Sequence, residues 1–163
     1  MVSAGRYYHD EDVVSYFTEA TEGGLTEREQ GLVESYFTGQ APTVLDLGCG
    51  AGRTTGPLEA RGFDVVGVDM SEAMITAARE NTSGPELLVG DATDLPFEDE
   101  CFDYVLFSRC GLDDVVPEQS RYEALREAYR VLRPGGRFGF DSNNAIHRYI
   151  FDPASLEDVR SHL

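Results

Sequence analysis

Residues 44–53 read VLDLGCGAGR, a short apolar run followed by three glycines at alternate positions, 48, 50 and 52. The apolar run predicts a buried strand over 43–47, and the glycines allow the backbone to turn tightly where that strand ends. A dinucleotide-binding fingerprint, GxGxxG, requires glycine at position 53, where this chain has Arg53. The loop is therefore GxGxG, which does not favour a nicotinamide dinucleotide.

Strands and helices alternate on both sides of this loop. Further strands are predicted over 64–68, 86–90, 104–108 and 137–141, and helices over about 53–61, after Ser71 and over 118–132. Two amphipathic helices precede the first strand, and Thr26 with Glu29 has the form of a capping box at the second. The pattern predicts an α/β fold with a doubly wound, mostly parallel, Rossmann-like sheet of five strands. We expect a single domain over 1–163, with an N-terminal helical cap (1–40) and a core (43–141).

The chain is strongly acidic. Its 163 residues include 30 Asp and Glu against 13 basic residues, all of them arginine, for a net charge of −17. Because nucleic acids and anionic membranes are bound through positive charge, we expect neither as a partner. An acidic, lysine-free surface also indicates adaptation to high salt, where self-repulsion is screened.

The cysteines and the N-terminus bear on disulfides, metal sites and the cellular location. Cys49, Cys101 and Cys110 are odd in number and lack CxxC spacing, so neither a disulfide framework nor a metal site is expected. No stretch approaches the ~20 apolar residues of a membrane span, and the first residues lack the apolar core of a signal peptide. We therefore expect a cytoplasmic protein.

Acidic residues lie at or just after the ends of three predicted strands, at the edge of the sheet where such folds bind ligands. Asp46 precedes the glycine loop and suits an ammonium or sulfonium group. Asp69 ends the second strand and can accept both hydroxyls of a ribose, although it could instead cap a helix, for which Ser71 is better placed. Asp91, in Gly90-Asp91-Ala92, can meet the edge of a base or cap the turn before Leu95-Pro96.

Four segments, VLDLGCGAGR (44–53), VVGVDMS (65–71), GDATDLPFEDECFDYV (90–105) and REAYRVLRPGGRF (126–138), stand in this order. Together they resemble the class I S-adenosylmethionine-dependent methyltransferases, particularly the small-molecule branch, over residues 43–141. The resemblance implies S-adenosyl-L-methionine as cofactor, S-adenosylhomocysteine as product and a small-molecule acceptor.

The resemblance also implies a role for each matching position. Asp46 would help to hold the methionine amino group, directly or through water. The glycine loop would line the methionine and ribose portions, and Asp69 would take the ribose hydroxyls. Met70 would cover the adenine face, Asp91 and Ala92 would meet its edge, and Tyr7 and Tyr8 would close over the cofactor. Ser108 and Arg109 would lie near the methionine carboxylate and the methyl group. The implied cofactor-binding set is Asp46, Gly48, Cys49, Gly50, Gly52, Asp69, Met70, Asp91, Ala92, Ser108 and Arg109.

No catalytic residue is assigned by the sequence. A general base is needed only where the acceptor atom must lose a proton. The candidates near the implied site are Asp113, Asp114, Asp141 and His147, none of which has a partner at a diagnostic spacing.

The family usually continues past the fifth strand into an antiparallel strand pair, which this chain is expected to lack, by truncation after 163 or by nature. Residues 137–141 would then form an exposed edge, suited to a homodimer or another partner. The leading hypothesis is a methyltransferase acting on a small molecule. The alternative is a cofactor-binding domain without turnover, an interaction module or a fragment of a longer enzyme, and a nicotinamide oxidoreductase ranks third.

Overall fold

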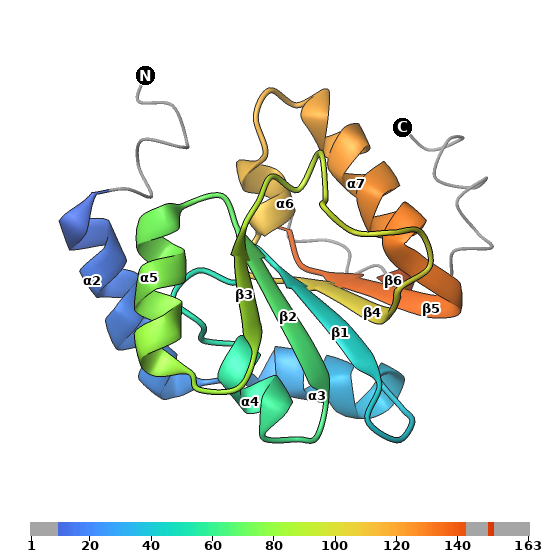
Figure 1. The fold of residues 1–163 in the computed structure, drawn as a ribbon, viewed down its shortest axis with the longest axis horizontal. Coiled ribbons are helices and arrows are strands. Elements are labelled where there is room, and N and C mark those ends of the chain that lie inside the picture. The colour runs from blue at the N-terminus through green and yellow to red at the C-terminus, as the bar shows by residue number, and fades with distance from the viewer. Residues whose placement is uncertain (1–9, 143–149, 152–163) are drawn as a thin grey trace.

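The described strands form one sheet in the order β3-β2-β1-β4-β5-β6 (Figure 1) in this computed structural model, which describes residues 10–142 and 150–151. Strands β1 to β5 run parallel, and β6 pairs antiparallel with β5. Their bounds are Thr43–Leu47 (β1), Asp64–Asp69 (β2), Glu86–Val89 (β3), Phe102–Phe107 (β4), Leu132–Phe140 (β5) and Ile150–Phe151 (β6). The predicted doubly wound, mostly parallel sheet is confirmed.

Helices cover both faces of the sheet (Figure 1). Helices α3, α4 and α5 lie on one face, with α2 beside α5, and α6 and α7 lie on the other. Their bounds are Glu11–Glu19 (α2), Glu27–Tyr36 (α3), Thr55–Glu59 (α4), Glu72–Asn81 (α5), Gly111–Asp114 (α6) and Ser120–Val131 (α7), and a 3₁₀ turn spans Ala20–Gly23. Among the described residues, no helix has the length and apolarity that crossing a membrane requires.

Both sides of β1 are buried, as its nearly continuous apolar sequence predicts. Val44 belongs to the core beneath α3 and α4, where it meets Leu58 and Val33. Leu45 and Leu47 belong to the opposite core, beneath α7. The first strand is therefore held from both faces, which makes its carboxyl end a rigid base for the glycine loop.

Two helix starts follow the local signals in the sequence. The side chain of Thr26 accepts a hydrogen bond from the Glu29 backbone, and the Glu29 carboxylate accepts one from the Thr26 backbone, which completes a capping box at α3. Ser71 caps α5 by accepting from the Met74 amide at 3.3 Å. The predicted caps are confirmed.

The last parallel strand is longer than predicted. The sequence predicted a strand over 137–141 after a helix over 118–132, but β5 begins at Leu132 and runs through Pro134-Gly135-Gly136. The pairing with β4 shifts register between Phe102 and Tyr104, so a bulge accommodates the extra residues. Gly135 has φ +83, a conformation that glycine adopts without strain.

The expectation of an exposed edge along residues 137–141 is wrong. Strand β6 pairs with the middle of β5, with Phe138 opposite Phe151 and Gly139 opposite Ile150. At these two residues, the edge that was expected to be open is paired within the chain. The predicted homodimer through this strand therefore loses part of its structural basis.

Candidate functional site

A cavity of about 470 Å³ lies at the carboxyl ends of β1, β2, β3 and β4. Its volume falls in the range of small-molecule sites. The strand order places it at the switch point of the sheet, since β1 lies between β2 and β4 and the chain leaves the sheet centre in opposite directions on either side. Nine of the eleven predicted site residues line it: Gly48, Cys49, Gly50, Asp69, Met70, Asp91, Ala92, Ser108 and Arg109.

The glycines of the loop have different tasks. Gly48 has φ +67, and a Cβ there would come within 2.8 Å of the Phe107 ring. Gly50 donates its backbone N–H to Asp69 Oδ2 at 2.9 Å. A Cβ added to Gly50 would meet no protein atom within 4 Å, so the space beside this residue is open. Gly52 does not line the cavity. It lies against Ala78 and Thr82, where its missing side chain lets α5 approach the loop.

Asp69 connects two parts of the cavity wall. Its Oδ2 accepts from the Gly50 amide, and its Oδ1 accepts from the Ser71 amide at 2.9 Å. Because Ser71 itself supplies the cap of α5, the Asp69 carboxylate lines the cavity rather than serving as that cap. Met70, which is 49% exposed, follows it along the same wall.

Asp91 combines the two roles that the sequence left open. Its Oδ1 accepts from the backbone N–H of Thr93 at 2.9 Å and from the Thr93 hydroxyl at 2.8 Å, so it does cap a turn. Asp91 and Ala92 nevertheless line the cavity beyond the end of β3. Its position is compatible with contact to a base edge.

Asp46 lies behind the glycine loop rather than in the cavity wall, and only 1% of it is exposed. Its Oδ2 accepts from the hydroxyls of Thr54 and Thr55, each at 2.6 Å. Its Oδ1 is buried and has no partner among the described residues. Burial raises the pKa of Asp46 to about 6, although the two hydroxyl hydrogen bonds oppose the shift. An unpartnered buried acceptor fits a cationic group reached through a water molecule.

The segment after β4 has an unusual backbone. Arg109 and Cys110 both have positive φ, 52 and 60, although neither is glycine. Such conformations cost energy and concentrate at ligand sites. The turn is held by a hydrogen bond from the Cys110 amide to Asp141 Oδ1 at 2.9 Å, and the Arg109 guanidinium lies 5.3 Å from the centre of the Phe17 ring.

An ion pair beside the cavity was missed at the level of sequence. Arg53 donates to both carboxylate oxygens of Glu29, at 2.6 and 2.7 Å, and both side chains are more than nine-tenths buried. Burial would raise the pKa of Glu29, but hydrogen bonds from Arg53 and Thr26 outweigh it and lower the pKa. In the sequence, only the presence of an arginine at position 53 pointed to this ion pair. No local pattern links Arg53 to Glu29.

Of the candidate bases that the structure describes, only Asp114 lines the cavity. Asp113 accepts from the Ser142 hydroxyl at 2.9 Å, Asp141 holds the Cys110 amide, and Asp114 lines the cavity. His147, Tyr7 and Tyr8 lie outside the described residues.

The Cys49 thiol, which lines the cavity, stays neutral, because burial and then the charges of Asp46 and Asp69 raise its pKa well above its usual range. Within the described part of the chain, no group of side chains is suited to hold a metal ion.

The geometry defines a Rossmann-like nucleoside-binding domain, with a glycine loop after the first strand and a carboxylate at the end of the second. A family model described as a methyltransferase domain matches residues 45–140, and the chain belongs to this family. S-adenosyl-L-methionine is accordingly its cofactor, and the cavity residues fit it.

Two curated relatives illustrate the family. The chain is 43% identical over 97 residues to a demethylmenaquinone methyltransferase of Clavibacter sepedonicus, covering 58% of this chain and 38% of that protein. It is 40% identical over 112 residues to a malonyl-[acyl-carrier protein] O-methyltransferase of Erwinia pyrifoliae, covering 68% and 41%. The chain therefore spans about two-fifths of the length of these relatives.

Solved structures agree with the fold. A structure of the Haloferax volcanii Trm112 methyltransferase activator with its putative methyltransferase matches with TM-score 0.72 and 27% identity, covering 84% of this chain and 60% of that chain. The TehB-like SAM-dependent methyltransferase of Corynebacterium glutamicum matches with TM-score 0.72 and 25% identity, covering 93% and 80%.

Proposed function

We propose that this chain is the cofactor-binding part of a methyltransferase that transfers a methyl group from S-adenosyl-L-methionine to a small-molecule acceptor. The observation that carries the proposal is the cavity itself, in which the glycine loop, Asp69 and the Asp91-Ala92 turn converge at the switch point of the sheet. The family match and the strand order support the same reading.

The bound cofactor supplies an activated methyl group on a sulfonium. In this proposal, Asp69 accepts hydrogen bonds from the ribose hydroxyls while it keeps the Gly50 amide in place. Asp46 contributes negative potential beneath the cationic end of the ligand. The apolar wall, including Phe17, Val115 and Val116, excludes water, which helps to orient the reacting atoms.

The acceptor is inferred to be uncharged or cationic, and partly apolar. Both arginines that line the cavity have partners: Arg53 binds Glu29, and Arg109 lies over Phe17. The wall also carries the carboxylates of Asp69, Asp91 and Asp114, which would repel an anionic acceptor. Of the acceptors that the relatives' names give, the reduced, hydroquinone form of demethylmenaquinone suits this wall better than a malonyl group, which carries a carboxylate.

A domain that binds the cofactor without turnover remains the second candidate. Two of the candidate bases make hydrogen bonds within the protein, Asp113 with Ser142 and Asp141 with Cys110, and neither of the two lines the cavity. A chain that spans two-fifths of its relatives' length would then need further residues to complete an acceptor site. Release of S-adenosylhomocysteine in the presence of naphthohydroquinone acceptors separates the candidates, since only a catalytic domain produces it.

Calorimetric titration tests cofactor binding. In molar salt, we expect S-adenosylmethionine and S-adenosylhomocysteine to bind and NAD to give no heat. Asp69→Ala should weaken binding at least tenfold, or about 1.4 kcal/mol, because the ribose loses its acceptor and the Gly50 amide is released.

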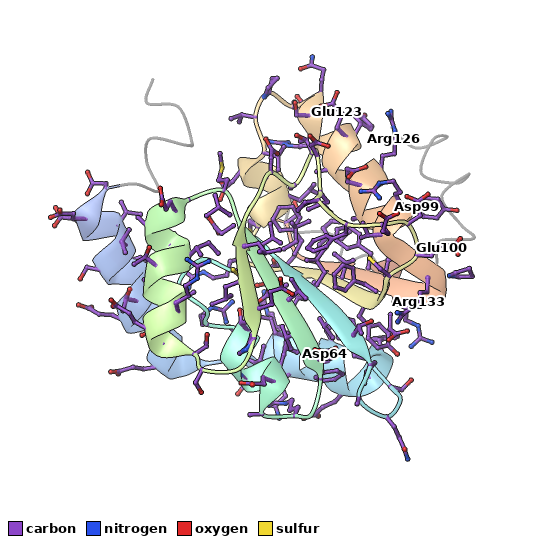
Figure 2. All side chains as sticks on the ribbon, viewed as in Figure 1. Asp64, Asp99, Glu100, Glu123, Arg126 and Arg133 are labelled. Carbon is purple, nitrogen blue, oxygen red and sulfur yellow. The ribbon has the colours of Figure 1, made fainter. Side chains whose placement is uncertain are left out.

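Asp64→Ala is the matched control. Asp64 begins the strand that Asp69 ends, is exposed, and lies away from the cavity (Figure 2). Its removal changes the net charge equally and should leave affinity unchanged. Equal losses in the two variants would mean that Asp69 acts only through charge, and binding of NAD in place of the adenosyl compounds would overturn the proposal.

The remaining expectations from the sequence stay predictions. They are the cytoplasmic location, adaptation to high salt and the lack of a nucleic-acid partner. The homodimer is not proposed, since β6 pairs with Phe138 and Gly139, in the middle of the strand edge on which it depended.

A further inference from the structure

The Arg53 guanidinium joins three separate parts of the chain. It donates to Glu29 in α3, to the Gly24 carbonyl at 2.7 Å in the segment before α3, and to the Ser108 hydroxyl at 3.3 Å after β4. Its own backbone belongs to the turn that follows the glycine loop. A single side chain therefore links the N-terminal cap, the glycine loop and the end of β4.

The Glu29 carboxylate is shared between two tasks. Its Oε2 accepts from the Thr26 amide at 2.7 Å as part of the capping box, and also from Arg53. Its Oε1 accepts from the other guanidinium nitrogen at 2.6 Å. The cap of α3 thus fixes the carboxylate, and the carboxylate fixes the plane of the guanidinium, since a two-point contact defines orientation as well as distance.

Stability alone is a weak reason for such a pair. Desolvating two ions is costly, and buried ion pairs can often be replaced by apolar side chains without loss of stability. What apolar side chains cannot reproduce is the directional link to Ser108 and Gly24. Arg53 and Ser108 both line the cavity, and Ser108 immediately precedes the strained residues Arg109 and Cys110.

We propose that the Glu29–Arg53 pair is a positioning unit of the ligand site, which sets the glycine loop and the Ser108 turn at the spacing that the cofactor requires. This inference rests on the proposed function. Arg53 is a positioning residue, and Glu29 acts through Arg53. The N-terminal helical segment that carries Glu29 therefore becomes part of the site, although Glu29 itself does not line the cavity.

The alternative is that Arg53 binds the ligand directly. Both terminal nitrogens of its guanidinium already donate to protein acceptors, two from each nitrogen. A direct role would require at least one of these bonds to break. The two roles predict opposite effects of weakening Glu29: a positioning unit loses affinity, whereas a direct ligand is released and keeps it.

The test is calorimetric titration of S-adenosylhomocysteine into the wild-type chain and the variants E29Q, R53K, R53M and E29M/R53M, with melting temperatures measured in parallel. We expect E29Q, R53K and R53M each to bind at least tenfold more weakly, at temperatures well below melting. In E29M/R53M the melting temperature should recover most of what R53M loses, while the affinity stays at least tenfold low. R130M removes a surface arginine network away from the cavity and should bind as the wild type does.

Two outcomes overturn the inference. If E29M/R53M regains wild-type affinity together with its melting temperature, the pair is only structural. If E29Q binds as the wild type does while R53M does not, Arg53 is a direct ligand. E29Q and R53K, which change the fewest atoms, decide the matter if the methionine variants do not fold. A wild-type chain that does not bind the probe would overturn the proposed function instead.

Discussion

Two arginines hold networks of similar composition in very different surroundings. Arg53 binds a carboxylate, a carbonyl and a hydroxyl beside the cavity, and its side chain is 9% exposed. Arg130, in α7, binds Glu127 and Asp99 and the carbonyls of Leu95 and Phe97, and its side chain is 29% exposed. Figure 2 shows Asp99 beside the C-terminal half of α7, on the outside of the molecule.

The two networks differ in how much hydration the carboxylates of Glu127 and Glu29 lose on burial. Hydrogen bonds from Arg130 lower the pKa of Glu127, and the little burial that opposes them matters less. For Glu29 the largest influence on the pKa is burial, which raises it, and only several hydrogen bonds together reverse the direction. The surface network therefore anchors the 95–99 loop at small cost, whereas the buried one exchanges hydration for a fixed geometry.

Removing each arginine should give the largest contrast. Arg53→Met leaves the Glu29 carboxylate buried without its cation, so we expect a loss of about 3–5 kcal/mol in the free energy of unfolding. Arg130→Met leaves carboxylates that water can reach, so about 1–2 kcal/mol is expected. Urea denaturation measures both, and equal losses would contradict the comparison.

Asp46 extends the comparison to a buried carboxylate without a direct arginine partner. Because burial raises the pKa of Asp46 to about 6, its contribution to stability is full below its unfolded value of 3.8 and is lost as pH rises through 6. The loss amounts to about 3 kcal/mol. For Glu29, whose pKa is lowered, stability is instead present above its unfolded value of 4.5 and is lost as pH falls through its folded pKa.

Asp46→Asn isolates this effect from the other carboxylates. The difference in unfolding free energy between the wild type and this variant should change by about 2.4 kcal/mol between pH 4 and pH 7, which is most of that loss, and the change should favour the variant at pH 7. Thermal denaturation across the range measures it. A difference that does not vary with pH would show that Asp46 keeps its ordinary pKa.

Thr26→Ala should have the smallest effect. It removes the side-chain cap of α3 but keeps the Thr26 amide that donates to Glu29, so we expect a loss of about 1 kcal/mol. Affinity for S-adenosylhomocysteine should not change, because Arg53 still holds the carboxylate. Thr26→Ser, which retains the hydroxyl, is the control, and a tenfold loss of affinity in Thr26→Ala alone would show that the Thr26 hydroxyl is also needed to position the ligand site.

The parts of the fold that local chemistry determines could be predicted from the sequence. The run at 43–47 and the Ser71 cap are signals within a few residues, and the structure has both. Strand β5 was predicted to begin only at residue 137, because Pro134-Gly135-Gly136 was expected to end the preceding helix and no local pattern continues a strand through it. In the structure, a register shift against β4 lets the strand include these residues. Strand β6 has only two residues and is defined by its pairing with β5, which no local pattern reveals.

The candidate site divides in the same way. The glycine loop, Asp69 and Asp91 follow predicted strands, and parallel strands bring their carboxyl ends together at one edge. The family resemblance placed Gly52 with the cofactor, but Gly52 lies against Ala78 and Thr82 and outside the cavity wall, a distinction that depends on where α5 lies. The Glu29–Arg53 pair joins residues from separate elements, so only the assembled fold shows it.

The burial of the Glu29–Arg53 pair also affects how its stability changes with temperature. Hydration of charged groups becomes less favourable as temperature rises, so the desolvation cost of a buried ion pair falls on heating. The link between the N-terminal cap and the glycine loop should therefore weaken less with heating than contacts that rest on water-exposed side chains. In this chain, heat would loosen the periphery before the junction at Arg53.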